Sequence, residues 1–381
     1  MGKLRVGLLF GGRSVEHDVS IVSATSILAA LDRSKYEVSL IAVDPDGHWH
    51  LAPAEMALDE VSREADVFLP ATPGASALRP ADERNVAARG PIGEAGRLDV
   101  IFPIIHGHGG EDGALQGLFE LADIPYVGSG VLSSALQMDK DFAKRLLSHA
   151  GLPVTPWISF SGGELDRDGL PAAARRAEEE IGFPVFVKPA NSGSSIGIAR
   201  AESIPELIAA LADAQRYDRK VLVEAAVDAR EIEVAVLGND DPEASIPGEI
   251  RAAKTFYDYD AKYRDAATEL IIPAPLDPDQ TEAIRALAVE AYRALDAEGM
   301  ARVDFLVDRR TGQIFLNELN SLPGFTAESS MYPRLWGASG LPYPALLDRL
   351  IELALERHDR RSKLETSPPS RLGKRAGSDT D

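Results

Sequence analysis

The first residues of the chain contain a nearly continuous apolar run, 4 to 10, which ends at the glycine pair Gly11 and Gly12. A run without polar alternation is typical of a strand that is buried on both faces of a parallel sheet. Apolar residues at helical spacing follow from 19 to 31, and a second strand is predicted from 37 to 43. The chain therefore begins as an α/β unit.

A second glycine-rich turn, HGHGGEDG, follows another predicted strand at 100–105 and precedes a helix that extends through residue 121. Open α/β sheets bind ligands at the turns that follow their parallel strands. Glu16 and His17 follow the first turn and His106 lies in the second, so these turns suit the ammonium and carboxylate of an amino acid. An alternative interpretation needs no ligand. Glu16, Asp18 and Asp112 lie near predicted helix N-termini, where acidic side chains cap the helix.

Length and composition narrow the class of protein. A chain of 381 residues has room for roughly two to three domains. It contains no cysteine, which excludes disulfides and thiolate chemistry, and its seven histidines show no zinc-ligand spacing such as HExxH. The net charge of -20 argues against a general nucleic-acid or acidic-membrane binder. The N-terminus lacks a signal-peptide pattern and no apolar run approaches the ~20 residues of a membrane span, so we expect a cytoplasmic protein.

The pattern changes along the chain. Residues 51–98 have weak periodicity, suggest short strands at most and receive no role. A helix is predicted at 139–149, and short strands and hairpins follow from 184. Residues 251–273, rich in Tyr, Asp and Lys, resemble an exposed loop. A last helix is predicted from 344 to 357, followed by a polar tail that we expect to be disordered.

The hairpin ARVDFLVDRRTGQIFLNELN carries the most informative polar residues. Because side chains alternate along a strand, Arg302 shares a face with Asp304, and Glu318 shares one with Asn320. If the two strands pair so that the numbers of opposite residues add to an even number, as with Asp304 opposite Leu316, all four side chains lie on the same face. The opposite, core face then carries Val303, Phe305, Val307, Phe315 and Leu319. Two carboxylates and an amide oxygen suit Mg²⁺, and Arg302 suits a phosphoryl oxygen, although a solvated face with a surface salt bridge fits the same pattern.

Two further segments fit nucleotide binding. In VKPANSGSSIG, Lys188 ends an apolar strand and precedes a loop of small residues whose N–H groups can approach phosphate oxygens. In VLVEAAV, Glu224 interrupts an apolar strand and needs a partner, which an adenine amino group or a nearby Lys or Arg supplies. Each segment alone is also explained by an ordinary loop or ion pair.

Taken together and in order, these segments resemble the D-alanine–D-alanine ligase family of the ATP-grasp superfamily, from residue 6 to about 347. The matching stretches are GGRSVEHDVS, HGHGGEDG, GSGVLSSALQMDK, VKPANSGSSIG, VEAAVDAREIEVAVLG, FYDYDAKY, ARVDF, NELNSLPGF and SMYPRLW. The resemblance implies an ATP-grasp fold, α/β with an α+β ATP-binding part. It implies a Rossmann-like substrate domain at 1–137, a central subdomain at 138–228, a C-terminal catalytic domain at 229–356 and a tail at 357–381.

The resemblance also implies a ligand set. Two Mg²⁺ (or Mn²⁺) ions are expected on Asp304, Glu318 and Asn320. Contacts to ATP are expected from Lys140, Lys188, Ser194, Ser195, Glu224, Ala226, Val227, Glu231 and Lys262. Among these, Lys140 and Lys188 are assigned to the phosphates and the adenine region. Glu224 with the backbone of 226–227 is assigned to adenine, and Glu231 to ribose.

The implied reaction joins two D-alanines through an acyl phosphate, for peptidoglycan precursor synthesis. Catalytic roles are expected for Glu16, Ser194, Tyr263, Arg302, Gly324 and Lys262. In this scheme Glu16 anchors the first ammonium in a Glu16–Ser194–Tyr263 set and His106 lies near the first carboxylate. Arg302 and the Gly324 N–H face the tetrahedral oxyanion. The second carboxylate is assigned to Ser330, with Ser329 as the alternative because the segment after Gly324 is one residue longer than usual. A homodimer is also implied.

Three alternatives remain. A ligase forming D-alanyl-D-lactate is disfavoured by Tyr263, and a catalytically silent paralogue by the retention of Arg302, Asp304, Glu318 and Asn320. A ligase for another amino acid pair is disfavoured by the Glu16 and His106 motifs. Ala225 occupies a position where relatives often carry a longer side chain. Its short side chain is expected to pack less tightly against the adenine ring.

Overall fold

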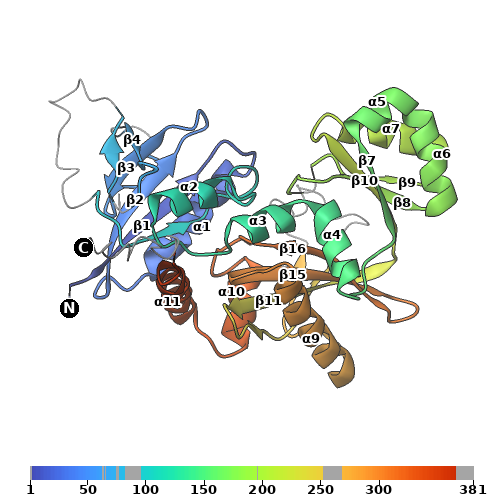
Figure 1. The fold of residues 1–381 in the computed structure, drawn as a ribbon. Coiled ribbons are helices and arrows are strands. Elements are labelled where there is room, and N and C mark those ends of the chain that lie inside the picture. The colour runs from blue at the N-terminus through green and yellow to red at the C-terminus, as the bar shows by residue number, and fades with distance from the viewer. Residues whose placement is uncertain are drawn as a thin grey trace, which may run out of the picture.

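The computed structural model describes residues 2–61, 64, 66–73, 77–81, 96–194, 196–251 and 268–365. Figure 1 shows an N-terminal lobe, a C-terminal lobe beside it, and a central lobe at the far side of the C-terminal one. No helix among the described residues has the length and apolar character required to cross a bilayer.

The N-terminal lobe is built on one mixed sheet with the strand order β5-β4-β3-β2-β1-β6. Its parallel part contains β1 (Leu4–Gly11), β2 (Tyr36–Val43) and β6 (Val100–Pro103). The antiparallel extension contains β3 (Trp49–Pro53), β4 (Asp66–Phe68) and β5 (Arg79–Pro80). The helices are α1 (His17–Ala30), α2 (Ala114–Ala122) and α3 (Val131–Met138). The predicted α/β unit is confirmed, and the segment with weak periodicity supplies short edge strands.

Strand β1 is apolar throughout because both of its faces are covered. Val6, Leu8 and Phe10 belong to one buried cluster together with residues of α1. Leu9 belongs to a second cluster that includes Phe119 of α2. Two covered faces remove the polar alternation that a half-exposed strand shows, as the sequence pattern predicted.

The central lobe is an antiparallel sheet with helices on one side (Figure 1). Its strand order is β7-β10-β8-β9, formed by β7 (Trp157–Ser161), β10 (Lys220–Ala225), β8 (Val185–Pro189) and β9 (Ala199–Ala201). The covering helices are α5 (Gly162–Asp168), α6 (Leu170–Glu180) and α7 (Ile204–Ala214). Helix α4 (Lys140–His149) leads into this lobe, and its N-cap Asp139 accepts hydrogen bonds from two backbone N–H groups.

The C-terminal lobe holds the second antiparallel sheet, with the order β14-β13-β11-β15-β16 and β12 paired to β11. The strands are β11 (Ala229–Gly238), β12 (Glu243–Ala244), β13 (Gly248–Arg251), β14 (Glu269–Ile271), β15 (Gly299–Asp308) and β16 (Ile314–Asn320). Helix α9 (Pro278–Ala294) packs on β11 and β15, and α10 (Met331–Ala338) follows the sheet.

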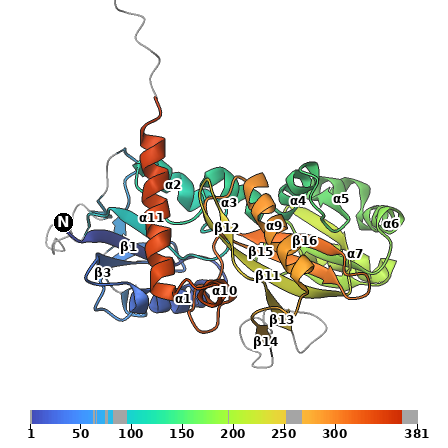
Figure 2. The same cartoon turned by 90° about the horizontal axis from the view of Figure 1, so that it is seen from below.

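The last helix differs from its prediction in length and in place. Helix α11 spans Tyr343–Ser362, so residues 357–362, expected in the disordered tail, are helical. Its buried leucines join the cluster of β1 and α1, and Figure 2 shows the helix lying along the N-terminal lobe. The last helix of the region assigned to the C-terminal domain therefore packs in an apolar cluster that the N- and C-terminal lobes share.

Candidate active site

A cavity with an empty volume of about 1150 Å³, part of it open to solvent, lies where the lobes meet. Ten residues predicted to act in the site line it: Glu16, His106, Lys140, Ser194, Arg302, Glu318, Asn320, Gly324, Ser329 and Ser330. These residues come from the turns after β1 and β6, the start of α4, the loop after β8, the β15–β16 hairpin and the loop before α10. The tertiary structure thus gathers residues that are more than 300 positions apart.

The β15–β16 hairpin places its four polar residues as predicted but in a different register. Arg302 lies opposite Asn320 and Asp304 lies opposite Glu318, so all four share one face. The example register, with Asp304 opposite Leu316, is wrong by two residues. A bulge follows at Asp304 and leaves Asn317 as the extra residue of β16.

The bulge also corrects one predicted core residue. Phe305 pairs with Leu316, which is fully buried, whereas Phe315 is only half-buried. An inserted residue reverses the alternation of side chains beyond it. Leu316 therefore occupies the core position that the sequence assigned to Phe315. The other residues predicted for the core face are buried, namely Val303, Phe305, Val307 and Leu319.

Arg302 is the centre of a charged cluster, in which it faces two carboxylates. Its Nε and Nη2 donate to the Asp304 carboxylate at 2.7 and 2.6 Å, and its Nε lies 3.1 Å from Glu233 Oε2. Burial lowers the pKa of Arg302, but the charges of Asp304 and Glu233 outweigh it and raise that pKa well above its usual value. The guanidinium is thus fixed in place and permanently charged.

The carboxylates predicted to hold metal have polar partners on the same face. Asn320 donates from Nδ2 to Asp304 Oδ2 at 3.0 Å, and Lys140 Nζ lies 3.3 Å from Glu318 Oε2. Within the described part of the chain, no three His, Cys, Asp or Glu residues stand together as a metal cluster. The third oxygen donor here is the amide of Asn320, and Mg²⁺ commonly takes one or two carboxylates and completes its shell with substrate phosphates. The donor set fits that ion.

A second charged cluster surrounds Glu224. Lys188 Nζ lies 2.8 Å from Glu224 Oε2, and Lys144 Nζ lies 3.5 Å from Oε1. Lys144 is only 1% exposed and also donates to Thr155 Oγ1 at 2.8 Å. Burial raises the pKa of Glu224, but Lys144 and Lys188 outweigh it and lower the net value. Lys188 also reaches the bulge residue Asn317, which links this cluster to β16.

The two lysines differ in their response to burial. Burial lowers the pKa of Lys144 and the neighbouring Glu224 offsets this only in part, so the net pKa is lowered. Burial also lowers the pKa of Lys188, yet Glu224 and Glu318 outweigh it and raise the net value. Lys188 is the lysine whose charge the site stabilises more strongly.

Glu16 and Ser194 meet across two lobes. Ser194 Oγ donates to Glu16 Oε1, and both side chains are buried. Ser194 has a φ of +48°, a left-handed conformation that a serine adopts only where its surroundings impose it. This contact joins the loop after β8 to the turn after β1.

His106 is held from both ring nitrogens. Nδ1 contacts the Leu322 carbonyl at 3.0 Å and Nε2 contacts Ser23 Oγ at 3.2 Å. Burial lowers the pKa of His106, but Glu111 and Glu16 outweigh it, so the net pKa is raised and the imidazolium is favoured. His106 thus braces the loop that contains Leu322.

The loop after β16 is closely packed. A Cβ on Gly324 would lie 2.9 Å from Ser330 Oγ. Ser330 Oγ also accepts a hydrogen bond from the Thr326 N–H at 2.9 Å, and Ser329 is more exposed than Ser330. Both serines line the cavity, so the assignment of the second carboxylate to Ser330 stays a prediction.

The remaining predicted residues that the structure describes do not line the cavity. Asp304, Lys188 and Glu224, described above, lie outside its lining. Ala226, Val227 and Glu231 lie half-buried at the β10–β11 connection and in early β11, also outside the lining, and the Ala226 N–H donates to the Pro184 carbonyl. Ser195, Lys262 and Tyr263 lie outside the described residues.

Several residues of the site were not predicted from the sequence, and four of them carry charged or amide side chains. Glu111, Gln137 and Glu233 line the cavity, and Lys144 partners Glu224. Lys144 lies four residues after Lys140 on one helix, and Glu233 lies two residues after Glu231 on one strand. Both spacings place the missed residue on the same face as a predicted one, which is the signal that was available.

Comparison with known families agrees with this arrangement. The family model described as D-ala D-ala ligase N-terminus matches residues 5–129, and the one described as D-ala D-ala ligase C-terminus matches residues 146–352. A D-alanine–D-alanine ligase of Thermoanaerobacter sp. (strain X514) is 48% identical over 95% of this chain and 99% of its own. One of Shouchella clausii is 47% identical over 96% and 99%.

Solved structures show the same similarity. The D-alanine-D-alanine ligase from Coxiella burnetii has a TM-score of 0.82 and 37% identity, covering 95% of this chain and 97% of its own. The VanG D-Ala:D-Ser ligase from Enterococcus faecalis has a TM-score of 0.80 and 33% identity, covering 93% and 100%.

Proposed function

Because the chain belongs to the D-alanine–D-alanine ligase family, we propose that it joins two molecules of D-alanine at the expense of ATP. The ATP-grasp fold expected from the sequence is confirmed by the solved structures that it resembles. The product, D-alanyl-D-alanine, serves peptidoglycan precursor synthesis.

One observation carries the proposal most directly. Glu16 and His106 of the N-terminal lobe line the same cavity as Arg302, Glu318 and Asn320 of the C-terminal lobe. Glu16, for the ammonium of an amino acid, and His106, near its carboxylate, therefore face the residues proposed for phosphoryl transfer. An amino acid bound by its two charged groups at the N-terminal lobe would present its carboxylate to that site.

In the first step, a carboxylate oxygen of the first D-alanine attacks the γ-phosphorus of ATP. The new O–P bond yields an acyl phosphate as the bond to the β-phosphate oxygen breaks and ADP leaves. Glu16, held by Ser194, anchors the ammonium, and His106 lies near the carboxylate. Lys140 and Lys188 offset the phosphate charge, and catalysis rests on positioning and electrostatics.

In the second step, the amine of the second D-alanine attacks the acyl carbon. A C–N bond forms, the amine loses a proton, and the C–O bond to phosphate breaks. Arg302, fixed by Asp304 and Glu233, offsets the charge on the tetrahedral oxygen together with the Gly324 N–H. Ser330 is proposed for the second carboxylate, with Ser329 as the alternative. Lys262 and Tyr263 keep their proposed roles at the phosphoryl group and as a candidate proton acceptor.

The base of ATP is proposed to lie beside Glu224, whose carboxylate accepts the adenine amino group while the backbone at 226–227 meets the ring edge. Glu231 is proposed for the ribose, and Ser194 and Ser195 for the loop that covers the phosphates. Asp304, Glu318 and Asn320 would hold two Mg²⁺ (or Mn²⁺), which supply charge neutralisation at the phosphates. A homodimer is proposed as the assembly.

The test is phosphate release from Mg²⁺-ATP with D-alanine, L-alanine, and D-alanine plus D-lactate. We expect release with D-alanine alone, none with L-alanine, and loss of activity in Glu318→Ala. Formation of a depsipeptide with D-lactate would establish the competing ligase instead. Tight ATP binding without turnover on any substrate would point to a silent paralogue.

A further inference from the structure

Besides the apolar cluster that they share, the N- and C-terminal lobes contact each other at two glycines, Gly128 and Gly299. Both have positive φ values, +98° and +73°, which favour glycine. A Cβ built on Gly299 would lie 3.2 to 3.3 Å from backbone atoms of Gly128, so the two backbones are in close contact. We call Gly128, Ser129, Glu298 and Gly299 the glycine joint.

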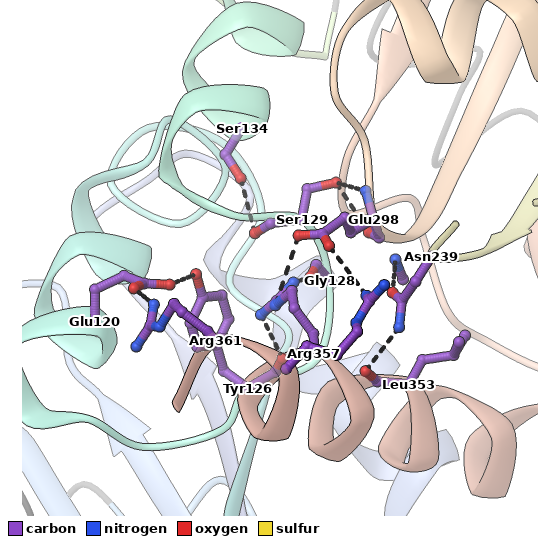
Figure 3. A network of polar contacts seen from close by, with 12 residues as sticks. Glu120, Tyr126, Gly128, Ser129, Ser134, Asn239, Glu298, Leu353, Arg357 and Arg361 are labelled. Carbon is purple, nitrogen blue, oxygen red and sulfur yellow. Dashed lines mark hydrogen bonds and ion pairs between the residues drawn. The ribbon is translucent and has the colours of Figure 1, made fainter. Parts of the chain in front are cut away.

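Side chains reinforce this joint (Figure 3). Ser129 Oγ donates to the Glu298 carbonyl at 3.0 Å and accepts from the Glu298 N–H at 3.2 Å. Asn239 accepts from the Gly299 N–H at 3.2 Å and donates to the Leu353 carbonyl of α11 at 3.1 Å. The contact is therefore directional, because the Ser129 hydroxyl of the N-terminal lobe pairs with both the N–H and the carbonyl of Glu298.

Arg357 closes the joint from the last turns of α11. Its guanidinium donates to the Gly128 carbonyl and, at 2.9 Å, to the Tyr126 carbonyl, and it lies 4.2 Å from the centre of the Tyr126 ring. It also approaches Glu298 Oε2 at 3.9 Å, and its side chain is only 11% exposed. The planar fork of an arginine can hold two carbonyls and a carboxylate at once.

The glycine joint lies at the start of β15, the strand that carries Arg302. Gly299 begins β15, and Arg302 follows three residues later on that strand. On the other side, Tyr126 bridges to Ile101, and the Val127 N–H donates to the Ile101 carbonyl, so this segment is part of the N-terminal sheet edge. A shift at the joint would therefore move Arg302 relative to the turns that carry Glu16 and His106.

We infer that Arg357 is a positioning residue that, through Gly128 and Glu298, sets the N-terminal half of the D-alanine site against Arg302. The inference rests on the proposed function for its substrate. It also accounts for the basic sequence after residue 356, which the sequence analysis assigned to a tail. Neighbouring Arg360 and Arg361 extend the same contact, to Asp240 and Glu298 and to Glu120 respectively.

The nucleotide site supplies an internal control. Lys144, Lys188 and Glu224 contact one another and β16, and none of them belongs to the glycine joint. Loss of Arg357 should therefore weaken use of D-alanine while leaving ATP binding intact. A general loss of folding would weaken both.

The experiment compares Arg357→Met and Arg357→Lys in the full chain with Arg349→Met. Arg349 lies on the same helix, but its ion pairs, with Glu352 and Glu356, stay within that helix. We expect Arg357→Met to lower kcat/KM for D-alanine on the order of ten- to a hundredfold, because small misplacements of reacting groups have effects of that size. The Kd for ATP should change less than about twofold, and lysine should restore part of the activity because it keeps the charge but not the fork.

A second readout does not depend on catalysis. The chain contains no cysteine, so spin labels can be attached at Arg33→Cys and Arg293→Cys, two exposed positions in the N-terminal and C-terminal lobes. We expect a broader distance distribution in Arg357→Met than in the parent or in Arg349→Met.

Unchanged D-alanine kinetics and an unchanged distance distribution would overturn the inference. So would a parallel loss of ATP affinity and thermal stability without recovery by lysine. If the parent protein releases no phosphate with D-alanine, the proposed function fails, and the distance distributions alone decide whether Arg357 holds the lobes.

Discussion

The two buried charged clusters of the active site have opposite charge balances. Around Glu224, two lysines, Lys144 and Lys188, face one carboxylate. Around Arg302, two carboxylates, Asp304 and Glu233, face one guanidinium. An excess of positive charge suits an anionic nucleotide, with Glu224 proposed beside its base and Lys188 at its phosphates, whereas an excess of negative charge suits a divalent cation. This difference fits the proposed placement of ATP and Mg²⁺ at neighbouring positions of one cleft.

Arg302→Met should break this balance most severely. It leaves Asp304 and Glu233 without their shared cation, and breaking a buried ion pair costs about 3–5 kcal/mol. We also expect kcat to fall by on the order of 10²–10³, because the variant loses a donor to the developing oxyanion. Urea unfolding and phosphate release measure the two effects, with Arg349→Met as the surface control. Near-parental turnover would remove Arg302 from the mechanism.

Lys144→Met should affect the other cluster next most strongly. Glu224 keeps Lys188 as a partner, so the stability loss should lie below the roughly 3–5 kcal/mol expected when a buried charge is left alone. We expect ATP affinity to weaken about tenfold, since 1.4 kcal/mol corresponds to that factor. Calorimetric titration with ATP measures the affinity. A tighter Kd would mean that Lys144 opposes binding instead of orienting Glu224.

Glu233→Gln sharpens the comparison because it removes one negative charge and nearly preserves shape. Arg302 keeps Asp304, so the fold should be retained. We expect the Mg²⁺ concentration needed for half-maximal rate to rise several-fold, about the effect of 1 kcal/mol of electrostatic coupling. A Mg²⁺ titration of phosphate release, with Glu290→Gln at an exposed position of α9 as the control, checks it. An unchanged midpoint would show that Glu233 serves Arg302 alone.

The last prediction concerns the dependence of stability on acid pH. The pKa of Glu224 is lowered from 4.5 in the folded protein. A lowered folded-state pKa stabilises the fold above the unfolded value, and that contribution is lost as the pH falls below 4.5 through the folded value. Glu224→Gln should therefore lose stability at pH 7 and show a shallower decline below pH 4.5. Unfolding midpoints between pH 7 and pH 3 measure this, and parallel curves would contradict it.

Much of the site was predictable because local patterns report local structure. Alternation along β15 and β16 predicted that Arg302, Asp304, Glu318 and Asn320 share a face, and the register confirms it. The same alternation could not reveal the bulge, so Phe315 was placed in the core where Leu316 lies. A bulge depends on how two strands pair, which neither strand encodes alone.

The sequence by itself determined the α/β character of the first lobe, the family, and ten of the residues that line the cavity. Only the tertiary structure decided which charges meet. Lys144 forms an ion pair with Glu224, eighty residues later in the chain. Arg357, near the C-terminus, donates a hydrogen bond to the Gly128 carbonyl. The basic end of α11 looked like a tail because its partners lie on other elements. Ion pairs between distant segments leave no periodic signal, since their energy depends on burial and geometry that only the folded chain creates.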